Sequence, residues 1–494
     1  MAEMFLNGLI TLANPECIGL IFAGVIVGII FGSLPGLSTT TAFVLFLPLT
    51  YTMGLFPSFA ILMAIYVGGV SGGLISAILI NTPGTMASVS TAFDGYPMTQ
   101  KGEGAKALGV ALMFSFLGTL LGITVLVFAA PTIAGFALQF TNYEYFALTL
   151  FSLTLIAGLS GKSMLKGLSS GCVGIMLSMV GLAPIDSVKR FTFGSNLLLN
   201  GFEITTLVIA FYAYGEILKN AEKVQSRFAA PKQNVKIKGF GFSFAEFKGQ
   251  IVNLFRSSAI GIAIGVLPGI GGGTSNLISY ATAKNASKYP EKFGTGIIDG
   301  IVASESCNNA SLGGALVPLL TLGIPGDGPS ALLLGAFTVH GLAAGPLLFS
   351  TNGDLVYYIF ACMLVSTFVM LFVEYLGMRA FIRILSFPIS VVMPVVFLLC
   401  IVGTYAINSS IFDVTTILLF GILGLLMVKF EFPVAPVMLG FILGPMVETY
   451  LRRALQMSQG SIIPFFTRPV SAIFILLSVV FSLYTILKTK PQRV

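Results

Sequence analysis

The sequence contains few charged residues and almost none of the side chains on which soluble enzymes depend. Only 9% of its 494 residues are charged, whereas a soluble domain carries about a quarter. Histidine occurs once, tryptophan never, and the five cysteines are scattered without a Cys-x-x-Cys pair. This composition excludes an ordinary soluble domain and indicates neither a metal site nor a disulfide framework. Phenylalanine and tyrosine must form any aromatic belt at a membrane surface.

Apolar residues are abundant instead, at 56% of the chain. Few or no charges occur in several long stretches, for example 17–32, 105–130, 361–376 and 470–487. At ~20 residues per spanning helix, the apolar segments leave room for roughly 10 to 14 helices. The N-terminus lacks the basic region and cleavage site of a removable signal peptide, so we expect the first apolar segment to be retained. The sequence therefore predicts an all-α polytopic membrane protein.

One polar stretch interrupts this pattern near the middle of the chain. Residues 219–256 contain eight lysine or arginine residues against only Glu222 and Glu246. In a membrane protein, an excess of basic residues indicates the cytoplasmic side rather than nucleic-acid binding. We therefore interpret 219–256 as a cytoplasmic linker between a first transmembrane repeat, 1–218, and a second, 257–494.

The two halves share short motifs in the same order and at similar spacing. The segment "FGSLPGLS" at 31–38 matches "IGVLPGIG" at 264–271. Further on, "SGGLISAILINTPG" at 71–84 matches "LGGALVPLLTLGIPG" at 312–326. Each half thus carries a Leu-Pro-Gly break, an apolar helix, and a Gly-Gly-led helix that ends in Pro-Gly. This order predicts an internal duplication.

Equivalent loops of the two halves differ in charge. The loop 50–58 carries no charge, whereas its counterpart 283–294 carries three lysines. After the Pro-Gly segments the bias reverses, because 95–106 carries two lysines and 339–349 carries none. Opposite basic bias predicts that equivalent loops face opposite sides of the membrane. In transporters with such inverted repeats, interrupted helices from both halves meet at a site near the midplane.

Four segments combine Pro-Gly with hydroxyl, amide or glycine residues: "LPGLSTTT" (34–41), "NTPGTMAS" (81–88), "LPGIGGGTSN" (267–276) and "GIPGDGPS" (323–330). We call them breaks one to four. Non-helical backbone is tolerated at membrane depth only when it is buried in protein or lines a wet cavity. A single break is compatible with a simple kink, but two matched pairs favour a shared site. Helix N-termini at the breaks favour anions, while carbonyl and carboxylate oxygens favour a small cation.

These arguments give a set of candidate site residues. We expect the substrate to be bound by Ser38, Thr39, Thr40, Thr41, Pro83, Gly84, Ser88, Gly271, Gly272, Gly273, Thr274, Ser275, Asn276, Asn308, Asn309, Pro325 and Gly326. We expect the coupling ion to be bound by Asn81, Thr82, Glu305 and Asp327. Na⁺ is the first choice for that ion, and protons, carried by Glu305 or Asp327, are the alternative.

The acidic residues have different sequence contexts. Glu305 and Asp327 lie near breaks, and an intramembrane carboxylate is by default a functional candidate. Asp94, in "FDGYP", is interpreted as part of an ordinary turn at the membrane interface. The remaining carboxylates near expected helix ends are interpreted as interfacial or capping groups: Glu144, Glu203, Glu216, Glu374, Asp413, Glu431 and Glu448.

Residues 72–109 and 288–349, with their Asp-Gly-Tyr-Pro-Met and Gly-Ile-Pro-Gly blocks, closely resemble the large membrane subunit of tripartite tricarboxylate transporters, the TctA family. The resemblance implies a secondary transporter, not an enzyme, that imports di- or tricarboxylates across the bacterial inner membrane with a cation gradient. It also implies a small integral-membrane subunit and a periplasmic solute-binding protein as partners. Neither a cofactor other than the coupling ion nor nucleic acid is expected. The triple glycine 271–273 is a departure that leaves the particular carboxylate open.

Two other functions are compatible with parts of the sequence. A passive channel for organic anions needs no coupling ion, and uptake driven by an imposed Na⁺ or proton gradient distinguishes it from a symporter. The segment "GVSG" (69–72) matches a short serine-nucleophile pattern. An intramembrane protease would need Ser71 within hydrogen-bond reach of His340, the sole histidine.

Overall fold

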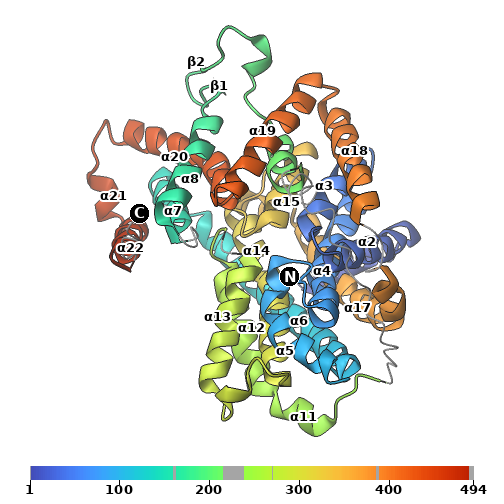
Figure 1. Ribbon diagram of the computed structural model, residues 1–494. Helices are drawn as coiled ribbons and strands as arrows, with labels where there is room; N and C mark the ends of the chain where they lie inside the picture. Colours follow the sequence, from blue (N-terminus) through green and yellow to red (C-terminus); the bar gives the residue numbers. More distant parts are fainter. Residues whose placement is uncertain (1, 159–162, 215–238, 270, 385–388, 489–494) are drawn as a thin grey trace. The chain divides into compact units, whose positions relative to one another are not determined.

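A computed structural model describes residues 2–158, 163–214, 239–269, 271–384 and 389–488. Helices make up most of this structure (Figure 1). The strands found in the described residues are one antiparallel pair of two residues each, in which Gly181 pairs with Arg190. The structure therefore confirms the predicted all-α polytopic fold.

The elements before the basic linker are α1 (Ala2–Leu12), α2 (Pro15–Ser33), α3 (Thr39–Thr50), α4 (Leu55–Ile80), η1 (Met86–Ser88), α5 (Val89–Gln100), α6 (Gly104–Ala137), α7 (Asn142–Gly158), α8 (Met164–Ser178), β1 (Gly181–Leu182), β2 (Lys189–Arg190), η2 (Asn196–Leu198), α9 (Ile204–Val208) and η3 (Ile209–Tyr214). The later elements are α11 (Phe244–Gly249), α12 (Ile251–Gly265), α13 (Gly271–Ala286), η4 (Pro290–Lys292), α14 (Ile298–Leu322), α15 (Gly328–Val339), α16 (Pro346–Thr351), α17 (Gly353–Ile384), α18 (Ile389–Asn408), α19 (Ile411–Lys429), α20 (Ala435–Met457), α21 (Ile463–Thr467) and α22 (Pro469–Lys488).

The chain forms two compact units, and each takes segments from both halves of the sequence. Unit 1 comprises Met1–Ala134 and Lys219–Gly403, and unit 2 comprises Gly135–Leu218 and Thr404–Val494. The compact units therefore do not coincide with the repeats expected at 1–218 and 257–494. All four breaks lie in unit 1, so the candidate site belongs to that unit.

Among the described residues, five helices are each long and apolar enough to cross a membrane: α2, α4, α6, α17 and α19. The helices that adjoin breaks one and four are much shorter, because α3 and α15 have 12 residues each. At 1.5 Å per residue such a helix is about 18 Å long, well short of a hydrocarbon core of about 30 Å. α3 and α15 are therefore half-length helices, as discontinuous segments require.

One equivalent pair of helices in each half packs together closely. α2 packs against α4, and α12 packs against α14. A Cβ atom on Gly28 of α2 would lie 2.6 Å from the backbone nitrogen of Gly69. A Cβ atom on Gly265 of α12 would lie 2.6 Å from the carbonyl oxygen of Ser311. Small residues let membrane helices approach this closely. The repeated packing supports the duplication, while the opposite orientation of the halves stays a prediction.

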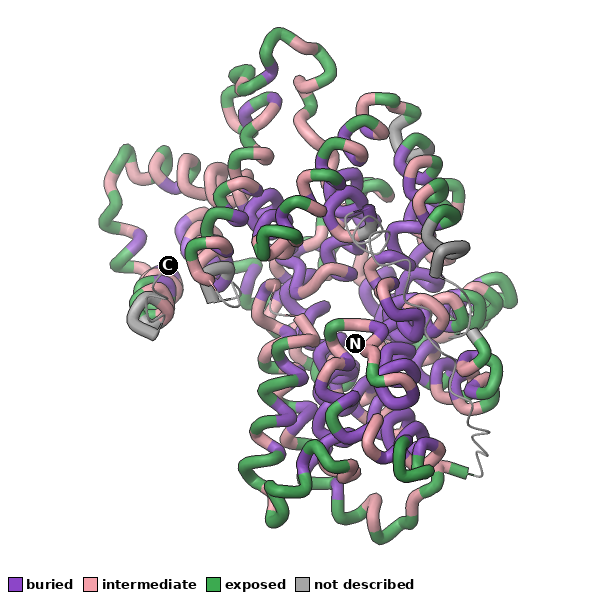
Figure 2. The backbone as a smooth tube through the Cα atoms, in the orientation of Figure 1, coloured by how far each residue is buried: buried purple, intermediate pink, exposed green. Residues whose placement is uncertain are grey.

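α4 and α14 are the central helices of unit 1. They are buried along almost their whole length, as the purple segments of Figure 2 illustrate. Their apolar residues lie on all sides rather than along one stripe, which is typical of a helix surrounded by other helices. Polar residues inside these two helices must therefore find partners within the protein.

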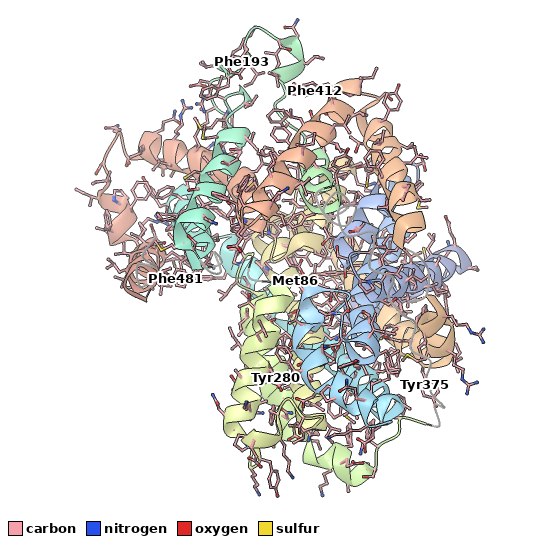
Figure 3. All side chains as sticks on the ribbon, viewed as in Figure 1. Met86, Phe193, Tyr280, Tyr375, Phe412 and Phe481 are labelled. Carbon is pink, nitrogen blue, oxygen red and sulfur yellow. The ribbon has the colours of Figure 1, made fainter. Side chains whose placement is uncertain are left out.

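Asp94 is not part of a turn, so the interpretation from sequence was wrong. It lies inside α5, is fully buried, and binds the loop that precedes α14. Its Oδ1 accepts hydrogen bonds from the backbone nitrogens of Gly294 (2.9 Å), Gly296 (2.8 Å) and Ile297 (3.0 Å). Its Oδ2 accepts one from the Tyr280 hydroxyl (2.8 Å) on α13, labelled in Figure 3. The Asp94 side chain thus connects α5, in the first half of the sequence, to the loop before α14, in the second half.

The basic linker lies largely outside the described residues, which resume at residue 239. The end of the expected linker is helical, because α12 begins at Ile251 and includes Arg256. Just before it, Lys106 Nζ and Glu246 Oε1 form an ion pair at 2.5 Å. The hydrogen bond from Lys106 lowers the pKa of Glu246 to about 2. This pair attaches the end of the linker to the start of α6.

The α2–α4 contact predicts a position-specific effect of added side chains. Gly28→Ala places a methyl group against α4 backbone, and we expect it to lower the free energy of unfolding by about 1–3 kcal/mol. Gly19→Ala is the matched control, because nothing lies within 4 Å of its added Cβ. Thermal unfolding of the purified chain in detergent measures both. Equal unfolding temperatures for the two variants would contradict the close packing.

The Asp94 contacts predict a large loss of stability in Asp94→Ala. The change leaves three backbone N–H groups and a tyrosine hydroxyl without their acceptor, and since each buried unsatisfied donor costs about 1–3 kcal/mol, we expect the free energy of unfolding to fall by about 3 kcal/mol or more. Lys101→Ala is the control, because Lys101 bonds the same loop at Thr295 from an exposed position. Trypsin cleavage after the lysines of 284–292 reports opening of the loop. Cleavage of Asp94→Ala at the rate of Lys101→Ala would refute this assignment.

Candidate functional site

Break two from the first half and break three from the second half contact each other. The amide of Asn276, on α13, donates to the backbone carbonyl of Ala87. A Cβ atom on Gly272 would lie 2.9 Å from the Ala87 Cβ, and one on Gly273 would lie 3.2 Å from the Met86 carbonyl oxygen. Figure 3 labels Met86 near the start of α13. The glycines at the start of α13 therefore permit the close approach of η1.

Breaks one and four are also brought together across the two halves. α3, which begins after break one, packs against α15, which begins after break four. Tyr66 on α4 donates to Asp327 Oδ2 at 2.6 Å, while Asp327 Oδ1 caps α15 by accepting from the Ser330 nitrogen at 2.9 Å. On the other side, the Ser38 hydroxyl caps α3 by accepting from the Thr41 nitrogen at 3.2 Å. A side chain therefore caps the start of each of these two helices.

The breaks of each half are also close to each other. In the second half, the Gly269 nitrogen donates to the Gly326 carbonyl at 2.8 Å, so a hydrogen bond joins breaks three and four. In the first half, a Cβ atom on Gly84 would collide with the Gly32 carbonyl oxygen at the end of α2. The equivalent glycine of the second half, Gly326, lies against Gly265 in the same way. Each half therefore holds its Pro-Gly break against the end of its own first helix.

α4 connects the two cross-half contacts. Tyr66 bonds Asp327 of break four, and the carbonyl of Val70 accepts from the Asn308 amide at 3.4 Å. The Asn308 Oδ1 lies 3.0 Å from the position of a Cβ atom on Gly272 in break three. Tyr66 and Val70 are one helical turn apart, about 6 Å along the axis. The breaks are thus gathered around α4 rather than dispersed through unit 1.

The polar groups at these breaks suit a charged ligand without basic side chains. The N-termini of α3, α13 and α15 carry partial positive charge from their first N–H groups. Gly271, at φ 64°, adopts a left-handed conformation that glycine tolerates best. The Asn276 Oδ1 is buried and lacks a hydrogen-bond partner within the described part of the chain. These features allow an anion to bind backbone N–H groups, while nearby oxygen atoms accept a hydrogen bond from the ligand or bind a cation.

The expected site residues differ in accessibility. Asn81 and Thr274 are exposed. The half-buried residues are Ser38, Thr40, Thr82, Pro83, Gly271, Gly272, Gly273 and Asp327. Buried are Thr39, Thr41, Gly84, Ser88, Ser275, Asn276, Glu305, Asn308, Asn309, Pro325 and Gly326. Several buried hydroxyls already have local partners; Ser88, for example, donates to the Thr85 carbonyl at 2.9 Å and Ser275 to the Gly272 carbonyl at 3.0 Å. Buried residues of this kind stabilise the backbone of the breaks, while the exposed and half-buried residues can contact a ligand directly.

Glu305 belongs to a different polar cluster. Its Oε1 accepts from the Thr91 hydroxyl at 2.5 Å, and its Oε2 accepts from the Ser115 hydroxyl at 2.8 Å and the Asn309 amide at 3.3 Å. Within the described part of the chain, this carboxyl forms no hydrogen bond with Asn81 or Asp327. Its three donors lie on α5, α6 and α14 rather than in the breaks.

Glu374 is not near a helix end, contrary to the interpretation from sequence. It lies inside α17, is fully buried, and accepts a hydrogen bond from the Ser71 hydroxyl at 2.7 Å. Its position in the apolar run 361–376 was the signal for an intramembrane carboxylate. Tyr66, Thr91 and Ser115 gave no comparable signal, because isolated hydroxyls are common in apolar helices.

The other carboxylates that were interpreted from sequence as interfacial or capping groups differ in where they lie. Glu144 in the first turn of α7 and Glu203 at the N-cap of α9 are capping groups, as expected. Asp413 lies in the first turn of α19, and Glu431 follows the end of that helix. Glu448 lies within α20, where it forms a bidentate pair with Arg190 at 2.7 and 2.8 Å. Glu216 lies outside the described residues.

The structure gives no support to a serine nucleophile at Ser71. The Ser71 hydroxyl donates to Glu374, and the His340 Nε2 is buried without a hydrogen-bond partner in the described ranges. Over the same ranges, no cluster of three or more histidine, cysteine, aspartate or glutamate residues is arranged to hold a metal. A hard cation at the breaks would therefore depend on backbone, hydroxyl and amide oxygens together with single carboxylates.

Comparison with known proteins identifies the family. Residues 18–439 match the family described as "Tripartite tricarboxylate transporter TctA family". An Agrobacterium vitis protein described as "Uncharacterized 52.8 kDa protein in TAR-I ttuC' 3'region" is 35% identical over 490 residues, covering 99% of this chain and 97% of that protein. A second A. vitis protein, described as "Uncharacterized protein in TAR-II ttuC' 3'region", is 35% identical over 237 residues, covering 47% of this chain and 98% of that protein. No solved structure matches. The chain belongs to the TctA family and is a membrane component of a tripartite tricarboxylate transporter.

Proposed function

We propose that this chain is a symporter that imports a di- or tricarboxylate across the bacterial inner membrane, with Na⁺ as the coupling ion. The observation that carries the proposal is the contact between breaks two and three, which come from different halves of the sequence. Substrate sites of inverted-repeat transporters are formed by such interrupted helices. In this account the half-length helices and their N-termini bind the carboxylate at the breaks.

The anion is bound by backbone N–H groups rather than by lysine or arginine. The accessible part of break three, Gly271–Thr274, provides the first N–H groups of α13, and Ser38 and Thr40 provide the start of α3. Helix N-termini are suited to bind carboxylates in this way. A site made of neutral dipoles binds a dianion reversibly, because it does not hold it with fixed positive charge.

Na⁺ is assigned to the oxygen atoms of breaks two and four. Asn81, at φ 53°, ends α4 in a left-handed conformation with an exposed side chain, and Thr82 follows it. Asp327 occupies the equivalent Pro-Gly break of the second half and remains half-buried. Amide, hydroxyl and carboxylate oxygens are the ligands that hard cations prefer. One or more Na⁺ ions at these positions would offset the negative charge of the substrate.

The proposed partners are a small integral-membrane subunit and a periplasmic solute-binding protein that delivers the carboxylate. Support comes from membership of a tripartite family. Binding of candidate carboxylates to the solute-binding protein identifies the substrate. Uptake of that carboxylate into proteoliposomes containing the full complex then tests transport, and uptake without any cation gradient would favour a passive channel.

Asn276 provides a test of the substrate site. Asn276→Ala removes the hydrogen bond to the Ala87 carbonyl and the buried Oδ1, at a free-energy cost of about 1–3 kcal/mol. We therefore expect the rate of uptake to fall about tenfold. Thr282→Ala is the matched control, because Thr282 is exposed on the same helix and its hydroxyl donates to the Ile278 carbonyl of that helix. Initial uptake rates over a range of substrate concentrations measure the effect. Wild-type uptake by Asn276→Ala would refute this location of the site.

Asn81 and Asp327 provide a test of the cation assignment. We expect Asn81→Ala and Asp327→Asn to raise the Na⁺ concentration for half-maximal uptake about tenfold, equivalent to about 1.4 kcal/mol. The KM for substrate at saturating Na⁺ should change less. Asparagine also caps helices well, so Asp327→Asn changes the charge while preserving the start of α15. The assignment fails if both variants keep the wild-type Na⁺ dependence.

A further inference from the structure

Two buried glutamates of unit 1 lie outside the breaks and form no ion pair with a basic side chain among the described residues. Glu305 on α14 and Glu374 on α17 are each fully buried. No salt bridge to either carboxyl is found among the residues that the structure describes. Two unpaired ionised carboxylates in an apolar interior are very costly. At least one of them must therefore be neutralised by a cation or a proton.

Hydrogen bonding distinguishes the two groups. Glu305 accepts three hydrogen bonds, from Thr91, Ser115 and Asn309, and these donors stabilise its ionised form. Glu374 accepts one bond, from Ser71 to Oε2, while its Oε1 is buried without a partner. When two carboxyl groups have unequal environments, one is favoured as the ionised carboxylate and the other as the neutral acid. The environment assigns the acid to Glu374.

The surroundings of Glu374 favour a proton over a metal ion. Helices α1, α2, α4 and α16 pack against α17, and Phe116 of α6 stacks edge-on against Phe368 of α17. In the described residues, Glu305 is the titratable group that acts electrostatically on Glu374. A metal ion needs several converging oxygen ligands, whereas one hydroxyl bonds this carboxyl. A proton needs only the carboxyl itself.

We propose that Glu374 is a proton-binding site of the transporter and that Glu305, with its three hydrogen-bond donors, remains ionised. A proton from water adds to the Glu374 carboxylate to give the neutral acid and returns to water when the carboxylate forms again. This inference rests on the proposed symport function and adds a proton to the Na⁺ assigned to the breaks.

The position of the pair connects it to break two. Ser71, which bonds Glu374, adjoins Val70, whose carbonyl accepts from Asn308. Two residues further along α4, a Cβ atom on Gly73 would lie 2.6 Å from the Thr85 hydroxyl of break two. On the other side of that break, Thr91 bonds Glu305. Glu374 thus bonds α4 before the break and Glu305 bonds α5 after it, so a proton on Glu374 changes the hydrogen bond on the α4 side.

Infrared spectroscopy of the purified full-length chain tests the protonation without any transport. We expect a carbonyl stretching band of a carboxylic acid at neutral pH that is lost in Glu374→Gln and kept in Glu305→Gln. A band that survives in Glu374→Gln, or is lost in Glu305→Gln, would overturn the assignment. If Glu374→Gln does not fold, Ser71→Ala should shift the band to higher frequency, and an unchanged band would also overturn it.

Uptake by the reconstituted complex tests whether the proton takes part in transport. Glu374→Gln should abolish the acceleration of uptake by an imposed proton gradient and keep its dependence on Na⁺. Acceleration equal to that of the wild type would show that the proton is not coupled. The infrared result does not depend on uptake, so failure of this inference is distinguishable from failure of the proposed function.

Discussion

The structure depends on one constraint, which is that backbone polar groups inside an apolar protein must find hydrogen-bond partners. Wherever a helix stops at a Pro-Gly break, its last carbonyls and the first N–H groups of the next helix lose their regular partners. Here the partners come from other breaks and from caps: Gly269 bonds Gly326, Ser38 caps α3, and Asp327 caps α15. At breaks three and four the partner comes from the other break, while the caps at breaks one and four come from within the break itself.

Glycine makes this gathering possible. The packing of α2 on α4 and of α12 on α14 brings backbone within contact distance of backbone, which a Cβ atom on Gly28 or Gly265 would prevent. The same close packing holds Gly84 and Gly326 against the ends of the first helices. Buried polar side chains are then fixed by their neighbours, as Asp94 and Glu305 show through three or more hydrogen bonds each. This close packing keeps the breaks at fixed positions relative to one another.

Much of this organisation could be predicted from the sequence, because apolar length, Pro-Gly breaks and paired motifs are local signals. The all-α membrane fold, the half-length helices and the family followed from them. Long-range partners could not be predicted in this way. Asp94 precedes a glycine, as many turn residues do, yet it binds a loop about two hundred residues away. Glu374 was assigned to a helix end because the sequence alone did not show that α17 continues to Ile384 or that Ser71 of α4 bonds this carboxyl.

The central claim is that breaks two and three meet and form the transport site, and a cysteine pair tests it most directly. A Cβ atom on Gly273 would lie 3.4 Å from the Met86 Cβ, close to the separation found in disulfides. In a variant without the native cysteines, Met86→Cys with Gly273→Cys should cross-link on oxidation and block carboxylate uptake until the bond is reduced. Two cysteines that react with thiol reagents yet never cross-link would contradict the account.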